Sequence, residues 1–139
     1  MTKTCFLFSF VLFLLFVETV CSTRQVVIEF LYHDPRDDPW WDPNCLPCLE
    51  EFNEFFKRNE TLNRIQSNYT GQIIVNWTEY YSSDGQAKKI LYNVNQANSI
   101  IIKSEEGNFT VIEGSFNETY IRAVIDAYLE GTPPPPPPP

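Results

Sequence analysis

The sequence is short of positive charge. Its 139 residues include 10 lysines and arginines against 18 aspartates and glutamates, and the net charge is −8. No basic stripe interrupts this acidic composition, and proteins that bind nucleic acid or adhere electrostatically to anionic lipid depend on such a stripe. The composition therefore argues against nucleic acid as a partner and against electrostatic attachment to a membrane surface.

A long hydrophobic run is also missing. The apolar stretch over residues 6–17 is shorter than the ~20 residues of a comfortable membrane span. It follows Lys3 and precedes Val20-Cys21-Ser22, so residues 1–22 are predicted to be a signal peptide that is cleaved after Ser22. No A-x-A cleavage site is present, and the alternative is an uncleaved N-terminal anchor. Under that alternative this segment is the only membrane contact expected.

Cysteines are few, and only one pair of them lies outside the predicted signal peptide. Two of the four, Cys5 and Cys21, lie in the predicted signal peptide. Its removal leaves the stretch Cys45-Leu46-Pro47-Cys48, which opens a predicted helix over residues 49–58. The partial positive charge of a helix N-terminus stabilises a thiolate, so the pair predicts a redox-active disulfide. A permanent structural disulfide is the alternative, although so short a ring adds little loop-closure stabilisation.

Five asparagines stand in N-x-T sequons, which are acceptors for N-linked glycans in secreted proteins. They predict a glycoprotein that passes through a secretory route, and most are expected at helix ends and turns. The alternative is an asparagine- and threonine-rich surface that carries no sugar. The five positions are Asn59, Asn68, Asn76, Asn108 and Asn117.

Hydrophobic periodicity predicts the element order β-α-β-α-β-β-α, which gives an α/β fold with a mixed sheet covered by helices. The first two strands are expected to be buried on both faces, and Ser83-Asp84-Gly85 is expected to form a turn. Arg58 is assigned to the outward side of the first helix. The predicted strands are Gln25–Tyr32, Ile73–Trp77, Ser99–Lys103 and Phe109–Glu113, and the later helices are Gln86–Tyr92 and one that runs from a capping box at Ser115–Glu118 to Gly131.

One domain is predicted over residues 23–131, followed by a tail over residues 132–139. The tail contains seven consecutive prolines, Pro133 to Pro139, which are expected to form an extended polyproline II segment. It could be a spacer or a ligand for SH3-like domains, and its lack of flanking basic residues leaves both readings open.

Residues 25–131 resemble the thioredoxin superfamily. Val27-Ile28-Glu29-Phe30 resembles the strand before the redox motif, and Cys45-Leu46-Pro47-Cys48 resembles a C-x-P-C motif. Residues 92–100 are similar to the family segment that contains a cis-proline, and Glu113-Gly114 resembles the glycine before the final helix. The resemblance implies a thioredoxin-like fold, a mixed four-stranded sheet flanked by helices.

The resemblance also implies a function, namely thiol–disulfide exchange on disulfides of other extracytoplasmic proteins without a cofactor. Cys45 is the expected nucleophile and Cys48 the resolving cysteine, and an unknown redox partner recycles the pair. Glu29 is expected to be a buried acid with a raised pKa that relays a proton to or from Cys48. The residues expected to contact substrate are Leu46, Pro47, Ala97, Asn98, Trp40 and Trp41.

The direction of exchange is predicted from charge. Leu46 and Pro47 bring no positive charge, and four aspartates precede the motif in sequence, where they would disfavour a thiolate if they lie close in space. A reductase or isomerase is therefore favoured over an oxidase. The four aspartates are Asp34, Asp37, Asp38 and Asp42.

Two departures from the family pattern stand out. The cis-proline position is Asn98, and because a cis bond before a non-proline residue costs ~3 kcal/mol, the Ala97–Asn98 bond is expected to be trans. In addition, fifteen residues separate Glu29 from Cys45, many more than in the family. The extra residues form a stiff, acidic and aromatic loop over 33–44.

Two other classes of function are compatible with the sequence. Two thiolates and His33 could hold a soft ion such as Cu(I), although no metal site is predicted as the main reading. A non-catalytic binding module could instead use Trp40 and Trp41 to dock a partner, unless one or both rings fold back onto the core. The loop aspartates lack the spacing and central glycine of a calcium loop.

Overall fold

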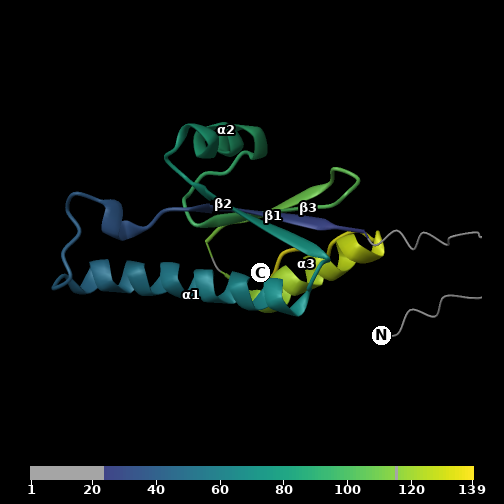
Figure 1. Cartoon of the computed structure of the whole chain (residues 1–139), viewed down its shortest axis with the longest axis horizontal. Coiled ribbons are helices and arrows are strands. Elements are labelled where there is room, and N and C mark those ends of the chain that lie inside the picture. The colour runs from purple at the N-terminus through teal and green to yellow at the C-terminus, as the bar shows by residue number, and fades with distance from the viewer. Residues whose placement is uncertain (1–23, 115) are drawn as a thin grey trace, which may run out of the picture.

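A computed structural model describes residues 24–114 and 116–139. The predicted signal peptide, with Cys5 and Cys21, lies outside the described residues. The order of elements agrees with the prediction (Figure 1), with one short 3-10 helix, η1, added after the first strand. In chain order the elements are β1 (Val26–Tyr32), η1 (Pro35–Asp37), α1 (Leu46–Asn68), β2 (Ile73–Glu79), α2 (Ser83–Tyr92), β3 (Ser99–Lys103), β4 (Phe109–Ile112) and α3 (Glu118–Glu130).

The four strands form one mixed sheet in the order β2-β1-β3-β4. The β1 strand pairs in parallel with β2 and antiparallel with β3, and β3 pairs antiparallel with β4. This confirms the predicted α/β fold with a mixed four-stranded sheet, and the arrangement is consistent with thioredoxin-like topology. Over the described residues, no helix is both long enough and apolar enough to cross a membrane.

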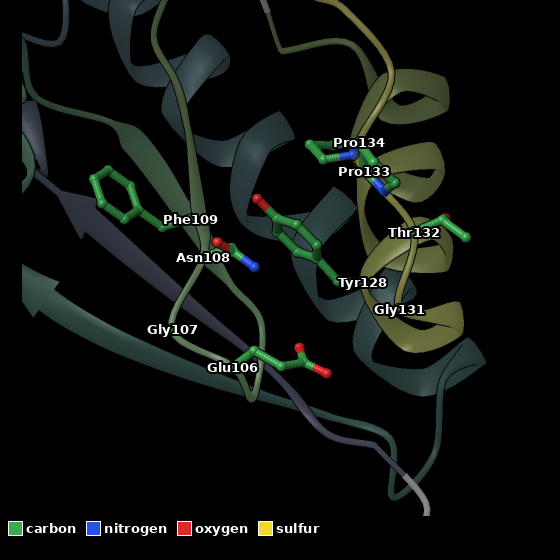
Figure 2. Close-up of a pocket in the computed structure, with 9 residues that line it drawn as sticks. All are labelled: Glu106, Gly107, Asn108, Phe109, Tyr128, Gly131, Thr132, Pro133 and Pro134. Carbon is green, nitrogen blue, oxygen red and sulfur yellow. The ribbon is translucent and has the colours of Figure 1, made fainter.

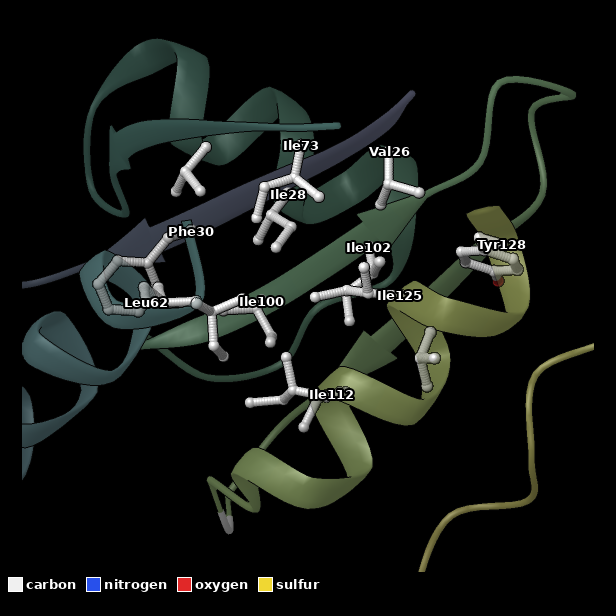
Figure 3. Packing of buried hydrophobic residues seen from close by; sticks show 14 of the residues in the cluster. Val26, Ile28, Phe30, Leu62, Ile73, Ile100, Ile102, Ile112, Ile125 and Tyr128 are labelled. Carbon is white, nitrogen blue, oxygen red and sulfur yellow. The ribbon is translucent and has the colours of Figure 1, made fainter. Parts of the chain in front are cut away.

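The alternation of side chains along β1 divides the core between two faces of the sheet. Ile28 and Phe30 point to the face covered by α1 and α3, where the larger hydrophobic cluster lies (Figure 3). Leu31 points to the opposite face, where it joins a smaller cluster with Tyr80 and Val94. Helix α2 lies on this second side of the sheet (Figure 1).

The prediction that β2 is buried on both faces is wrong. Ile73 and Val75 are buried, but Ile74 is 40% exposed and Trp77 is 38% exposed. The strand lies at the edge of the sheet, and Ile74 and Trp77, which point to opposite faces, are each only partly covered. A continuous apolar run does not distinguish a central strand from an edge strand, because position in the sheet depends on long-range pairing.

The predicted turn at residues 83–85 is instead the first turn of α2. Ser82 is the N-cap, and its side-chain oxygen accepts a hydrogen bond from the backbone N–H of Gly85 at 3.0 Å. Gly85 is buried because the helix packs closely onto the end of β2. A Cβ atom at this position would lie 2.1 Å from the carbonyl oxygen of Glu79 and 2.6 Å from that of Tyr80. Glycine is therefore required here because two backbone segments lie in close contact, and not because the chain forms a turn.

The last helix ends as predicted, but its N-cap lies two residues after the predicted cap. Asn117 is the N-cap of α3, and its side chain accepts a hydrogen bond from the backbone N–H of Tyr120. Ser115, the predicted cap, lies outside the described residues. Gly131 adopts the left-handed conformation with φ of 72° and closes the helix, which confirms the predicted stop.

We predict that Gly85→Ala destabilises the fold by about 1–3 kcal/mol, because the added methyl group meets backbone oxygens that cannot move independently. Urea unfolding followed by circular dichroism measures the change. Ser83→Ala, at an exposed position on the same helical turn, is the matched control and should change stability by less than about 0.5 kcal/mol. Equal stability of the Gly85→Ala variant and the parent would contradict the close packing of α2 on β2.

Candidate functional site

Cys45 and Cys48 form a disulfide at the start of α1. Their Cα atoms are 5.3 Å apart, well within the range that a disulfide can bridge. Cys45 is the N-cap residue, and its sulfur accepts a hydrogen bond from the backbone N–H of Cys48 at 3.3 Å. Both residues are half-buried, while Leu46 and Pro47 between them are exposed. A disulfide pair in this position suggests redox activity.

Helix α1 is longer than the sheet beneath it. Its 23 residues span about 34 Å, whereas the seven residues of β1 span about 23 Å. Phe55 is the first α1 residue that is fully part of the main core, and only Phe52 packs against this core from the turn before it. The first turns of α1 therefore project beyond the sheet (Figure 1), and they carry the disulfide with them.

The inserted loop braces the projecting end of α1. The guanidinium group of Arg36, in η1, lies 4.8 Å from the centre of the Phe52 ring. Asp34 holds Arg36 in place through an ion pair of 2.5 Å. At the end of the loop, the backbone N–H of Cys45 donates to the carbonyl oxygen of Asp42 at 3.0 Å. The loop therefore supports the part of α1 that extends beyond the sheet.

Two of the four loop aspartates are engaged in ion pairs. The Arg36 guanidinium lowers the pKa of Asp34, outweighing the burial that would raise it. Asp38 pairs with Nε2 of His33 at 3.2 Å. Asp42 remains next to the cysteines through the backbone contact with Cys45. The negative field at the disulfide is therefore weaker than four unpaired carboxylates would produce.

His33 joins the loop to the end of β2. Its ring is buried between Asp38 on the loop and Glu79 on β2, with Nδ1 3.4 Å from the Glu79 carboxylate. Tyr81 packs edge-on against the ring, with 4.9 Å between the centres. Burial alone would lower the pKa of His33, but the two carboxylates outweigh it and raise the pKa. When it is protonated, the ring joins the two segments through both carboxylates, and its nitrogens face these carboxylates and not the cysteines.

The two tryptophans of the loop behave differently. Trp40 is 75% exposed, and Leu46 beside the disulfide is 73% exposed. Trp41 is half-buried, and its indole N–H is buried without a hydrogen-bond partner among the described residues. Only Trp40 therefore presents a large free apolar surface on the same loop that supports the cysteines.

Glu29 is buried, but its surroundings differ from the prediction. Its carboxylate accepts hydrogen bonds from Lys88 at 2.7 Å, Lys103 at 2.8 Å and Asn76 at 3.3 Å. Burial would raise the pKa of Glu29, but these donors outweigh burial and lower it. The predicted rise in pKa is wrong, because two ammonium groups stabilise the charged form. Glu29 also faces the α2 side of the sheet, whereas α1 and Cys48 lie on the other side.

Asn98, at the family's cis-proline position, connects three parts of the fold. Its peptide bond with Ala97 is trans, as predicted, and its φ is 59°. The backbone N–H of Asn98 donates to the carbonyl oxygen of Leu31 at 2.7 Å. The carbonyl oxygen of Asn98 accepts a hydrogen bond from the guanidinium group of Arg58 at 2.9 Å. The side-chain oxygen of Asn98 accepts from the backbone N–H of His33 at 2.9 Å. Both backbone groups of Asn98 are therefore already engaged within the chain.

Arg58 is the residue whose role the sequence did not indicate. The sequence predicts an outward position on α1, but Arg58 is half-buried and also donates to the carbonyl oxygen of Gly114 at 2.9 Å. Burial lowers the pKa of Arg58. Arg58 lies about 20 Å along the helix from Cys45, so its contact with Asn98 places Asn98 beside the middle of α1 and not beside the disulfide.

The sequon asparagines occupy several kinds of position. Asn68 ends α1, Asn108 lies in the turn between β3 and β4, and Asn117 caps α3, as expected for helix ends and turns. Asn59 lies within α1, and Asn76 lies within β2, where its amide donates to Glu29. Asn76 is nevertheless exposed, like Asn68, Asn108 and Asn117, and only Asn59 is half-buried.

Across residues 24–114 and 116–139, no group of three or more histidine, cysteine, aspartate or glutamate side chains is arranged to hold a metal ion. The chain matches no model of a known protein family, and no curated protein sequence matches it. The geometry of the disulfide and its loop is therefore the basis for any statement about function.

We predict that His33→Gln removes a pH dependence from stability. The folded state raises the pKa of His33, so its contribution is full below the ordinary value of 6.5 and is lost as pH rises through the folded-state pKa. The parent should therefore exceed the variant in stability by more at about pH 5.5 than at about pH 8.5, as measured by urea unfolding. Asp38→Asn should show a smaller dependence of stability on pH than the parent. If the stability of the parent and of His33→Gln changed in parallel with pH, the proposed ion pairs of His33 with Asp38 and Glu79 would be ruled out.

Proposed function

We propose that this protein is an extracytoplasmic thiol–disulfide oxidoreductase that acts on disulfides of other proteins. The observation that carries the proposal is the Cys45–Cys48 disulfide, which caps a helix N-terminus and is accessible from solvent through the exposed residues Leu46 and Pro47. Secretion, and with it an oxidising compartment, is inferred from the predicted signal peptide and the sequons.

In the proposed reaction, an external dithiol first reduces the pair, which takes up two electrons and two protons. The thiolate of Cys45 then attacks one sulfur of a substrate disulfide, forms a mixed disulfide and releases one substrate thiolate. The thiolate of Cys48 attacks the sulfur of Cys45, which restores the Cys45–Cys48 bond and releases the second substrate thiolate. The substrate disulfide gains two electrons, and the protein dithiol loses two.

The nucleophile is assigned to Cys45 by the local geometry. Its sulfur already accepts the backbone N–H of Cys48, and a thiolate at this place would keep that hydrogen bond and face the positive end of the helix dipole. No lysine or arginine stands between the cysteines to lower the pKa of the thiol further. The reductase or isomerase direction follows from this moderate stabilisation, and ion pairing of Asp34 and Asp38 leaves Asp37 and Asp42 as the opposing charges of the loop.

Proton transfer is assigned to solvent. Glu29 is held by two lysines on the other face of the sheet, so its carboxylate is engaged away from the cysteines. The projecting end of α1 is exposed enough for water to exchange protons with both sulfurs. We propose that Glu29 contributes to folding, and that the exchange reaction proceeds without it.

The exposed apolar groups around the disulfide provide a surface for substrate. Leu46 and Pro47 lie between the cysteines and are exposed, and Trp40 is exposed on the loop that leads to Cys45. Exposed aromatic and aliphatic groups of this kind are typical of sites that dock another protein. A non-catalytic docking module would use the same surface, so the distinction depends on whether the disulfide reacts.

We predict that Cys48→Ser traps mixed disulfides with substrate proteins, because the resolving thiol is absent, whereas Cys45→Ser traps few. Each variant is expressed with its N-terminal segment in a secretory host, and adducts are resolved on non-reducing gels with and without dithiothreitol. The double variant Cys45→Ser with Cys48→Ser is the control for non-covalent association. Adducts in equal amount from both single variants would contradict the assigned roles. A parent disulfide that stays closed under mild reductant would instead favour a docking module.

A further inference from the structure

The polyproline tail has no part in the proposed exchange reaction, yet it is not free of the fold. Helix α3 ends at Gly131, and the backbone N–H of Thr132 donates to the carbonyl oxygen of Ala127 at 2.9 Å. The chain then turns back along the helix. Consecutive prolines fix φ and disfavour helical conformations for their predecessors, so the segment is restricted to the extended polyproline II form.

Contacts with the tail are spread along α3 and β4. Near the end of α3, Pro133 and Pro134 line an open pocket of about 640 Å³ together with Phe109 and Tyr128. Figure 2 shows the ring of Tyr128 between these prolines and the turn that leads into β4. The residues of this pocket come from β4, from α3 and from the tail itself, so the tail forms one wall.

Further along the tail, Tyr120 supplies a hydrogen bond. Its hydroxyl group donates to the carbonyl oxygen of Pro135 at 3.3 Å. Pro137 and Pro138 then line a second, smaller pocket with Tyr120 and Ile112. Burial raises the pKa of Tyr120, as expected for a hydroxyl group that is partly withdrawn from water. The tail therefore meets the fold at two pockets and at one hydrogen bond between them.

The lengths of the two segments match. The 13 residues of α3 span about 20 Å, and seven prolines in the polyproline II form span about 22 Å. Pro133 and Pro134 lie at the C-terminal end of α3, and Pro137 and Pro138 lie near Asn117 at its N-terminal end. The tail is therefore antiparallel to α3 and follows it from one end to the other.

The groove has the chemistry that a polyproline II segment requires. Proline has no N–H group, so such a segment is recognised through ring packing on aromatic side chains and through donors to its carbonyl oxygens. Tyr128 offers aromatic surface, and Tyr120 offers the donor. The ring of Phe109 lies on the other face of the sheet, edge-on against Tyr92. The hydroxyl group of Tyr128 is bonded to Thr110 at 2.7 Å, which fixes the position of the ring.

We propose that the groove between β4 and α3 is a binding site for a polyproline II segment and that the chain's own tail occupies it. The end of the tail also lines a pocket with Ile112 of β4, which is an edge strand of the sheet. Because prolines carry no N–H groups, the tail does not extend the sheet at this edge. A consequence is that the tail is withheld from other proline-binding domains as long as it stays docked.

The test uses a chain that ends at Thr132, which keeps the cap of α3. None of the tail prolines belongs to either core cluster, so the shortened chain keeps its fold. A synthetic peptide of seven prolines is titrated into the shortened and the full-length chains, and backbone amide signals are followed by NMR. A glycine–serine peptide of equal length is the control ligand.

The shortened chain should bind the proline peptide saturably, with signal changes confined to residues 109–112 and 117–128. The full-length chain should bind at least about tenfold more weakly, because its tethered tail competes at an effective concentration in the millimolar range. Tyr120→Phe in the shortened chain should weaken binding several-fold. Leu91→Ala, on the exposed surface of α2, should leave binding unchanged.

Three results would overturn the proposal. The first is the absence of saturable binding by the shortened chain, and the second is equal binding by the shortened and full-length chains. The third is identical amide signals for residues 109–112 and 117–128 in the two chains before any peptide is added. If Tyr120→Phe fails to fold, Thr110→Val, which removes the hydrogen bond that fixes the Tyr128 ring, replaces it and should also weaken binding.

Discussion

Helix α1 and the sheet differ in length, and the position of the disulfide depends on that difference. The helix spans about 34 Å and β1 about 23 Å, so packing of Phe55 and later residues on the core leaves the first turns unsupported by strands. The insertion between β1 and α1 fills this gap. Its ion pair between Asp34 and Arg36, and the packing of Arg36 on Phe52, hold the overhanging end.

Because the first turns of α1 extend beyond the sheet, two residues that the thioredoxin resemblance would place beside the cysteines lie away from them. Glu29 and its lysine partners stabilise the α2 face of the sheet, and Asn98 joins β1 to the middle of α1 through Arg58. Neither residue is brought beside the cysteines. The local chemistry that remains is the helix N-terminus and the hydrogen bond between Cys48 and Cys45. The proposed exchange reaction therefore rests on features of α1 and its loop alone.

Local patterns predicted the parts of the structure that depend on local interactions. Sequence neighbours predicted three features that the structure confirms. These are the disulfide between Cys45 and Cys48, the order of the helices and strands, and the end of α3 at Gly131. Long-range contacts decided the rest, namely the edge position of β2, the close packing at Gly85 and the lysine partners of Glu29. The burial of Arg58 belongs to the same class, because its partners Asn98 and Gly114 are 40 and 56 residues away in the sequence.

The most direct test compares the parent with Glu29→Gln in redox equilibrium with glutathione. The fraction of reduced Cys45–Cys48 is measured by thiol alkylation and mass spectrometry, under conditions where circular dichroism shows both chains folded. The account predicts reversible reduction of the parent and an equilibrium constant for the variant that agrees within about threefold, since Glu29 faces away from the disulfide. An irreducible parent disulfide, or a shift of tenfold or more in the variant, would contradict it.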